Sequence, residues 1–274
     1  MLCGWRNAAR RSGAFREAAA NVLEEAIELD HAIAALQERM THWKGSLTHA
    51  LPDSVLYNLA IDVREHGAAV KILAVSEVPR ASYANARSAL EAAIDMRYLV
   101  AVPGEYDRRG CLARSVELLG AEDFAKRRRA LDERLGVSDS PSYRHADDVM
   151  SAEADNWESA APSKGAILRT AFDEVMRRGN LRGHWSGLSR LDLLDSCGTL
   201  DPEGTSDADI LGIIHSFLSL QTHPSPRAGQ RAATVTPETA TVVFTNRPED
   251  RTHPSRAAAH ACVLAALSLD ARHE

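Results

Sequence analysis

The chain has 274 residues, of which 45% are hydrophobic and 26% are charged, a composition typical of a soluble globular protein that can bury a sizeable core. The formal net charge of -6 excludes an overall basic footprint for nucleic acid, and no apolar run reaches the roughly 18 residues of a membrane span. The cysteines are far apart and lack metal-ligand spacing: Cys3, Cys111, Cys197 and Cys262. We therefore expect reduced thiols, a cytoplasmic protein, no cofactor and no membrane contact.

The first third of the chain predicts three helices. Apolar residues at positions 22, 26, 29, 33, 36 and 40 step by three and four, which predicts one amphipathic helix. A second helix is expected from Asp53 or Ser54, as N-cap, to about Val78, because Pro79 cannot continue it. Residues 81–102 are apolar or alanine on nearly every face, so we expect this third helix at the centre of a bundle.

The next stretch predicts two helices and a long loop. Residues 105–120 and 121–136 each show an amphipathic pattern, and Gly120 is expected to break them apart. Residues 137–162 are polar and poor in aliphatic side chains, which predicts a long loop with at most a short helical turn.

Three further helices are expected before residue 224. The first covers about 163–178, and the second covers 189–198, with its first residue, a serine, as N-cap and its last, a glycine, as stop. Ser206 and Asp209 form a capping box that starts the third, which runs to about His223.

The C-terminal part combines a strand-like run with a last helix. Residues 240–245 predict a short, isolated strand, and residues 255–272 predict a helix. The tetrapeptide Thr-His-Pro-Ser occurs twice, at 222–225 and 252–255. The first copy is expected to close a helix and the second to open one, with Ser255 as N-cap.

These elements together predict an all-α helical bundle that forms a single domain over residues 1–274. Its core is expected over about 13–223. The C-terminal extension, 224–274, would carry the short irregular or strand-like insertion and the last helix.

Two helices carry polar strips where a core would be apolar. On the central helix the strip consists of Arg87, Ser88, Glu91, Asp95 and Tyr98. On the helix before His223 it consists of Asp209, Gly212, Ser216, Ser219 and His223, opposite an apolar face. Each strip is either a solvated face or part of a polar site in which the two strips meet. Arg87 and Glu91, four residues apart, are placed to form an ion pair.

Three segments in a fixed order resemble a known group. They are RSALEAAIDMRYL (87–99), HWSGLSRLDLLDSCG (184–198) and HSFLSLQTHPSP (215–226). Over about residues 55–228 the chain resembles an uncharacterised bacterial family of helical proteins with an Arg-x-x-x-Glu helix, a Trp-Ser segment and a Ser-x-x-x-His-Pro element. The matching positions are Arg87, Glu91, Trp185, Ser219 and His223.

That family is distantly similar in pattern to HEPN domains. The resemblance implies a helical bundle, often dimeric, of a kind common in bacterial toxins and phage defence, with many metal-independent ribonucleases. RNA and a second copy of the chain are the partners it implies. Nuclease members carry Arg-x(4–6)-His; this chain has three matches, Arg177 and Arg178 before His184 and Arg247 before His253, about as many as chance predicts. No arginine precedes His223 at that spacing.

The sequence gives weaker indications of a metal site or of a nucleic acid contact. Glu28 and His31 have the spacing of a di-iron ligand pair, but a second such pair is missing and both point away from the apolar stripe. Residues 126–134, KRRRALDER, mix both charges, which favours an ordinary charged helix face over a nucleic acid contact. The sequence contains no nucleophile elbow and no phosphate-binding glycine loop.

The sequence leaves two functions open. In the first, which the resemblance favours, the protein is an RNA-directed ribonuclease with His223 as acid or base. Arg87 or Arg227 would bind phosphate and Glu91 would orient one of these groups, while Ser216, Ser219 and Trp185 would contribute to binding. In the second, the protein is a non-catalytic ligand-binding or regulatory bundle.

Overall fold

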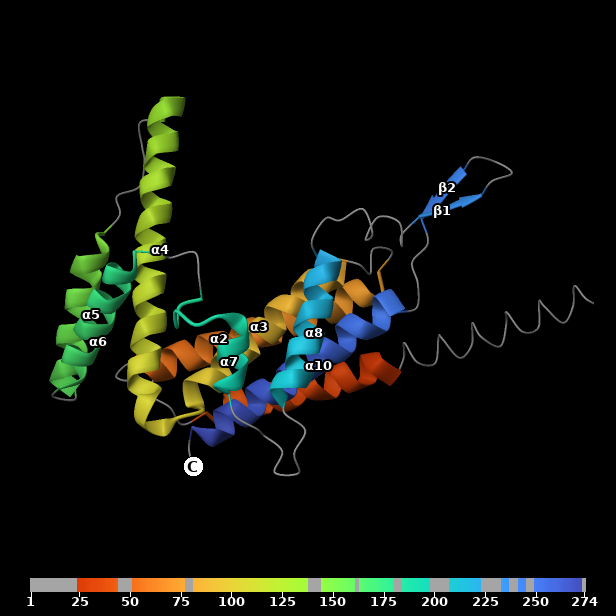
Figure 1. The fold of residues 1–274 in the computed structure, drawn as a ribbon, viewed down its shortest axis with the longest axis horizontal. Coiled ribbons are helices and arrows are strands. Elements are labelled where there is room, and N and C mark those ends of the chain that lie inside the picture. The colour runs from red at the N-terminus through yellow and green to blue at the C-terminus, as the bar shows by residue number, and fades with distance from the viewer. Residues whose placement is uncertain are drawn as a thin grey trace, which may run out of the picture. The chain divides into compact units, whose positions relative to one another are not determined.

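The computed structural model describes residues 24–43, 51–76, 81–137, 144–160, 163–179, 184–197, 207–222, 233–236, 241–244 and 249–272. In these ranges the regular structure is helical apart from one short hairpin, which confirms the predicted all-α helical bundle (Figure 1). The chain forms two compact units. Unit 1 comprises Met1–Trp43, Leu59–Arg97 and Thr199–Glu274, and unit 2 comprises Lys44–Asn58 and Tyr98–Gly198. The expectation of a single domain with a C-terminal extension stays a prediction.

Unit 1 includes an N-terminal helix, of which the structure describes residues 24–41, and most of α2 (Leu51–Ala74) and α3 (Ser82–Val100). The predicted stripe of the N-terminal helix is buried at Leu29, Leu36 and Met40. At its edge, Lys71 Nζ of α2 pairs with Asp30 Oδ1 at 2.5 Å.

The central helix α3 is as buried as its sequence predicts. Its fully buried side chains are Ala86, Ala89, Leu90, Ala93, Ile94, Met96 and Leu99. Small alanine side chains let neighbouring helices approach closely, because the distance between helix axes depends on the side chains at the contact. Arg87 and Glu91 interrupt this apolar surface as half-buried polar residues.

The predicted N-caps of α2 are wrong, since the helix begins at Leu51. Asp53 lies in the first turn and is buried, and its Oδ1 accepts a hydrogen bond from the Tyr106 hydroxyl at 2.8 Å. Ser54 donates to the carbonyl of Leu51 at 2.7 Å. A tertiary contact from Tyr106 therefore uses the carboxylate that the sequence suggested for capping.

Two predicted features of the middle of the chain are also wrong. Helix α4 runs unbroken from Tyr106 to Leu135 through Gly120, because one glycine costs a helix only about 1 kcal/mol. The predicted long loop contains α5 (Ala146–Ala160). This helix buries Ala146, Met150, Ala154 and Trp157, which are spaced by four, four and three residues. A narrow stripe with few aliphatic residues is therefore sufficient to stabilise a helix when the stripe faces a core.

The core of unit 2 lies between α4, α5 and α6 (Lys164–Arg178), which pack against one another (Figure 1). Its large buried side chains are Leu112, Leu118, Met150, Trp157, Leu168, Phe172 and Val175. Gly165 allows α5 and α6 to touch, because a Cβ there would lie 2.6 Å from the carbonyl oxygen of Ala154. The helix predicted over 163–178 is confirmed.

Glu122 joins α4 to the start of α5. Its Oε2 accepts the backbone N–H of Ala146, the first residue of α5, at 2.7 Å. Its Oε1 pairs with Lys126 Nζ at 2.5 Å and faces His145 Nδ1 at 3.3 Å. The hydrogen bond from Lys126, followed by that from the backbone of Ala146, lowers the pKa of Glu122 to about 2. A carboxylate from one helix therefore caps the next.

The short helix α7 (Arg190–Asp195) begins as predicted, with the Ser189 side chain accepting from the backbone N–H of Asp192. In unit 1, α8 covers Asp207–Thr222, and its predicted capping serine, Ser206, lies outside the described residues.

The C-terminal region differs from the sequence prediction in two ways. The strand-like run is not isolated, because β2 (Thr241–Phe244) pairs antiparallel with β1 (Ala233–Thr236). The last helix, α10, begins at Glu249 and ends at Ala271, so the second Thr-His-Pro-Ser copy lies inside it. Ser255 is buried in this helix and does not cap it. None of the helices in the described ranges is long and apolar enough to cross a membrane.

Candidate functional site

A carboxylate, a guanidinium and an imidazole meet between α3 and α8 in unit 1. Glu91 Oε1 accepts hydrogen bonds from Arg87 Nε at 3.0 Å and from His215 Nε2 at 2.8 Å. Arg87 Nη1 also donates to Thr222 Oγ1 at 3.3 Å. We call Arg87, Glu91, His215 and Thr222 the polar cluster.

Helix geometry explains why these four side chains meet. The two α3 residues are four positions apart, one turn of helix, and the two α8 residues are seven apart, about two turns. The earlier residue of α3 bonds the later residue of α8, so the two helices run antiparallel where they meet. Leu211 and Leu218 lie on the same face of α8 and are buried. Apolar packing therefore holds the two helices in register at the cluster.

The polar cluster is neither fully buried nor freely solvated. The exposed fraction of the side chain is 27% for Arg87, 29% for Glu91 and 15% for His215. Full burial of an ion pair carries a desolvation penalty of several kcal/mol per ion, which this partial exposure reduces. The carboxylate fixes the imidazole through Nε2, and Nδ1 has no hydrogen-bond partner among the described residues. An imidazole held in this way is suited to proton transfer.

The structure adds a histidine that the sequence analysis did not name. The ion pair between Arg87 and Glu91 is confirmed, but the imidazole that bonds Glu91 belongs to His215. The predicted His223 follows Thr222 directly in the sequence and lies outside the described residues, as does Arg227. In the sequence, Leu211, His215, Leu218 and Thr222 have helical spacing and lie one position before the predicted strip of Gly212, Ser216, Ser219 and His223.

The predicted binding serines of α8 have different surroundings. Ser216 is exposed. Ser219 is half-buried, and its carbonyl accepts the hydroxyl of Thr222 at 3.1 Å. This bond orients Thr222, whose Oγ1 accepts from Arg87.

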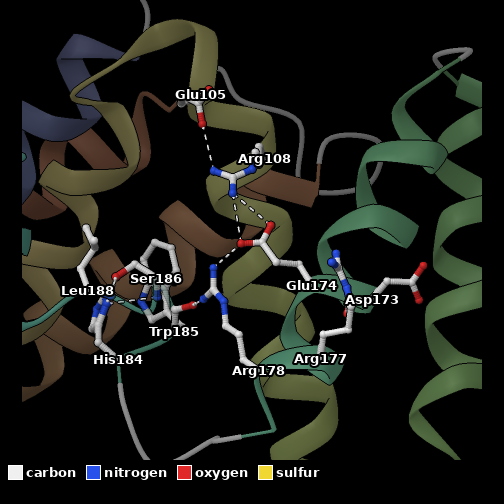
Figure 2. A network of polar contacts seen from close by, with 10 residues as sticks. All are labelled: Glu105, Arg108, Asp173, Glu174, Arg177, Arg178, His184, Trp185, Ser186 and Leu188. Atoms are coloured by element: carbon white, nitrogen blue, oxygen red, sulfur yellow. Dashed lines mark hydrogen bonds and ion pairs between the residues drawn. The ribbon is translucent and has the colours of Figure 1, made fainter.

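The predicted binding residue Trp185 lies in unit 2, in a turn that Figure 2 shows. Its ring packs on Tyr98 at a centroid distance of 5.3 Å and on the His184 ring at 4.8 Å. Its carbonyl accepts a hydrogen bond from Arg178 Nη1 at 3.2 Å. Trp185 therefore anchors this turn through both its ring and its backbone.

Glu174 is the centre of the ion-pair network in Figure 2. It bonds Arg108 Nη2 through both carboxylate oxygens, at 3.1 and 3.0 Å, and it also pairs with Arg178. Burial raises the pKa of Glu174, but the hydrogen bonds from Arg178 and Arg108 outweigh it, so the pKa is below its ordinary value. The network ties α6 to α4 and to the turn that carries Trp185.

This network accounts for the Arg178 and His184 pair that matches the nuclease spacing. The Arg178 guanidinium lies against Gly187, where an added Cβ would be 2.7 Å from Nη1. His184 Nδ1 accepts the backbone N–H of Ser186 at 3.2 Å and faces the Ser186 hydroxyl at 2.6 Å. Both members of the pair are thus engaged in shaping the turn.

The remaining candidates carry no further site. Within the described ranges, no group of three or more His, Cys, Asp or Glu side chains is placed to hold a metal ion. Glu28 and His31 are exposed, as their position on the helix predicts. The basic run of α4 pairs along its own helix, for example Arg127 with Asp123 at 2.8 Å.

Comparison with known proteins adds no relative: no family model, no curated protein and no solved structure matches this chain.

Proposed function

We propose that the protein is a metal-independent ribonuclease of the HEPN-like type found in bacterial toxins and phage defence, and that the polar cluster is part of its site. The observation that carries this proposal is the hydrogen bond between His215 and Glu91 beside the guanidinium of Arg87. These residues supply an oriented imidazole and a cation within one half-exposed cluster.

RNA cleavage without a metal uses the 2′-hydroxyl of the substrate as nucleophile. A base removes the proton of this hydroxyl, and its oxygen attacks the adjacent phosphorus. An acid protonates the departing 5′-oxygen, which leaves a 2′,3′-cyclic phosphate and a free 5′-hydroxyl. The reaction requires two proton-transfer groups and a positive charge near the phosphate.

The polar cluster provides candidates for these roles. His215 is the proposed base, because Glu91 orients it through Nε2. Arg87 is the proposed phosphate ligand, and Thr222 holds its Nη1 in place. His223, next to Thr222 in the sequence, is the proposed second imidazole, and Arg227 remains a second candidate cation.

The test is cleavage of defined RNA by the purified full chain in the presence of EDTA. We expect fragments with 2′,3′-cyclic phosphate ends from the wild type and from His42→Ala, a control that changes an exposed histidine outside the cluster. His215→Ala and His223→Ala should each lose most of the activity. Intact RNA with wild-type protein at high concentration, or full activity of both variants, would overturn the proposal.

One observation favours the alternative of a non-catalytic bundle. Glu91 already neutralises Arg87 and bridges two helices, as a structural network would. In that case the wild type would not cleave RNA, and His215→Ala would lower the free energy of unfolding. Parallel measurement of stability and cleavage separates the two functions.

A further inference from the structure

A hollow of unit 1 lies between α8 and α10, apart from the polar cluster. Its volume is about 320 Å³, within the range of roughly 300–1,000 Å³ for small-molecule pockets. Ile213, Ile214, Phe217 and Leu218 of α8 form one wall, and Ala257 of α10 contributes to the other. The lining is therefore mainly apolar, which favours a ligand with an apolar body.

The rim of this cavity on α10 carries hydrogen-bond donors on one face. His253, Arg256 and His260 are three and four residues apart, so they lie along the same side of the helix. The rings of His253 and Phe217 pack in a T-shaped arrangement, with their centroids 5.3 Å apart. The imidazoles and the guanidinium thus border the apolar wall directly.

Arg256 is held in place by a buried partner. Its Nε and Nη2 both bond Glu25 Oε1 in the N-terminal helix, and the side chain of Glu25 is only 4% exposed. Nη1 has no partner among the described residues, and the Arg256 side chain is 62% exposed. A guanidinium fixed on one side and open on the other is preorganised for an acidic group, because little side-chain entropy remains to be lost.

From this arrangement we propose that the cavity between α8 and α10 binds a small carboxylate with an apolar body of medium-chain length. The chain lies against Ile213 and Phe217, and the carboxylate accepts hydrogen bonds from Arg256 and from the histidine at position 260. This inference does not rest on RNA cleavage, since it uses other residues.

Besides Glu25, the ion-pair partner of Arg256, two further carboxylates oppose the binding of an acid. Glu24 and Glu28 lie within electrostatic reach of Arg256, and Glu28 lines a neighbouring hollow that shares Arg256 and His260 with this cavity. If these carboxylates controlled the site, it would select an amine in place of an acid. The sign of the preferred head group therefore decides whether the assignment is right.

The experiment is calorimetric titration of the full chain with octanoate, octanol and octylamine. We expect saturable binding of octanoate and at least about tenfold weaker binding of the other two, equivalent to about 1.4 kcal/mol. Absence of saturable octanoate binding would overturn the proposal. Equal or tighter binding of octanol or octylamine would overturn the assignment of a carboxylate.

Two isoleucines provide a matched pair of variants. Ile213 lines the cavity and is 71% exposed, whereas Ile72 on α2 is 67% exposed and is not among the residues that line it. Because both are exposed, aspartate at either position should leave the fold intact. Ile213→Asp should abolish octanoate binding, and Ile72→Asp should preserve it. The same affinity in both variants would place the ligand elsewhere.

Discussion

Alanine in place of Gly110 or Gly120 tests how α4 packs in unit 2. Both glycines lie inside the same helix, but their surroundings differ. A Cβ on Gly110 would lie 2.6 Å from Cβ and 2.7 Å from Cα of Pro52, at the start of α2. A Cβ on Gly120 would meet no atom within 4 Å.

The expected energies follow from these distances. Carbon atoms pack at about 3.5–4.0 Å, so Gly110→Ala forces the two backbones apart by about 1 Å, and such overpacking costs about 1–3 kcal/mol. Alanine also gains about 0.5–1 kcal/mol over glycine in a helix interior, and this gain is common to both variants. The difference in stability between Gly110→Ala and Gly120→Ala therefore isolates the contact with Pro52, at about 1–3 kcal/mol.

The assay is urea denaturation followed by far-ultraviolet circular dichroism. Gly120→Ala should be slightly more stable than the wild type, and Gly110→Ala should be less stable than Gly120→Ala by the amount above. A Gly110→Ala variant that is as stable as Gly120→Ala would refute the close approach of α2 and α4. A Gly120→Ala variant that loses stability would refute the open surroundings of that position.

Three further outcomes are expected. Because Lys126 lowers the folded pKa of Glu122, the wild type has stability above a pH of about 4.5 that it loses as the pH falls towards 2, and Glu122→Gln should remove this stability. Urea unfolding across this pH range measures the effect, and an unchanged pH dependence in the variant would contradict it. The Cys262 thiol, whose pKa burial raises to about 12, should resist alkylation in the native protein and react after unfolding, as peptide mapping would detect; labelling of the native thiol would argue against its burial. Tyr106→Phe should cost about 1–2 kcal/mol in the same urea assay, because buried Asp53 loses a hydrogen bond, and an unchanged midpoint would show that the bond contributes nothing.

The fold class was predictable because helical spacing of apolar residues is a local property of the chain. The N-terminal helix buries Leu29, Leu36 and Met40 of its predicted stripe, and α3 is as buried as its apolar composition predicts. Helix ends were predicted where the cap is a local side chain, as at Ser189. They were wrong where a distant group supplies or replaces the cap, as at Asp53, whose carboxylate accepts from Tyr106.

The errors in α4 and α5 share one cause. Composition suggested that Gly120 would end a helix and that residues 137–162 were a loop. Local propensity differs by only about 1 kcal/mol at such positions, so burial against other helices decides the outcome. Met150 and Trp157 are buried in the core of unit 2, and this contact stabilises α5 although its other residues are mostly polar.

Part of the candidate site could be predicted from the sequence. The pair of Arg87 and Glu91 is a local i,i+4 interaction within one helix, so its spacing was sufficient to predict it. The third member was not predictable in the same way. His215 meets Glu91 across 124 positions of sequence, and the rotation of α8 about its axis decides which of its residues faces α3.

The sequence by itself determined which segments are helical, which faces are apolar, and where an arginine and a glutamate lie one turn apart. These properties depend on residues within a few turns of each other. Only the tertiary structure decided that His215 joins this pair, that Trp185 anchors a separate network in unit 2, and that α8 and α10 line an open hollow. Each depends on how helices rotate and pack against one another, which is fixed by the fit of whole surfaces and not by any short stretch of sequence.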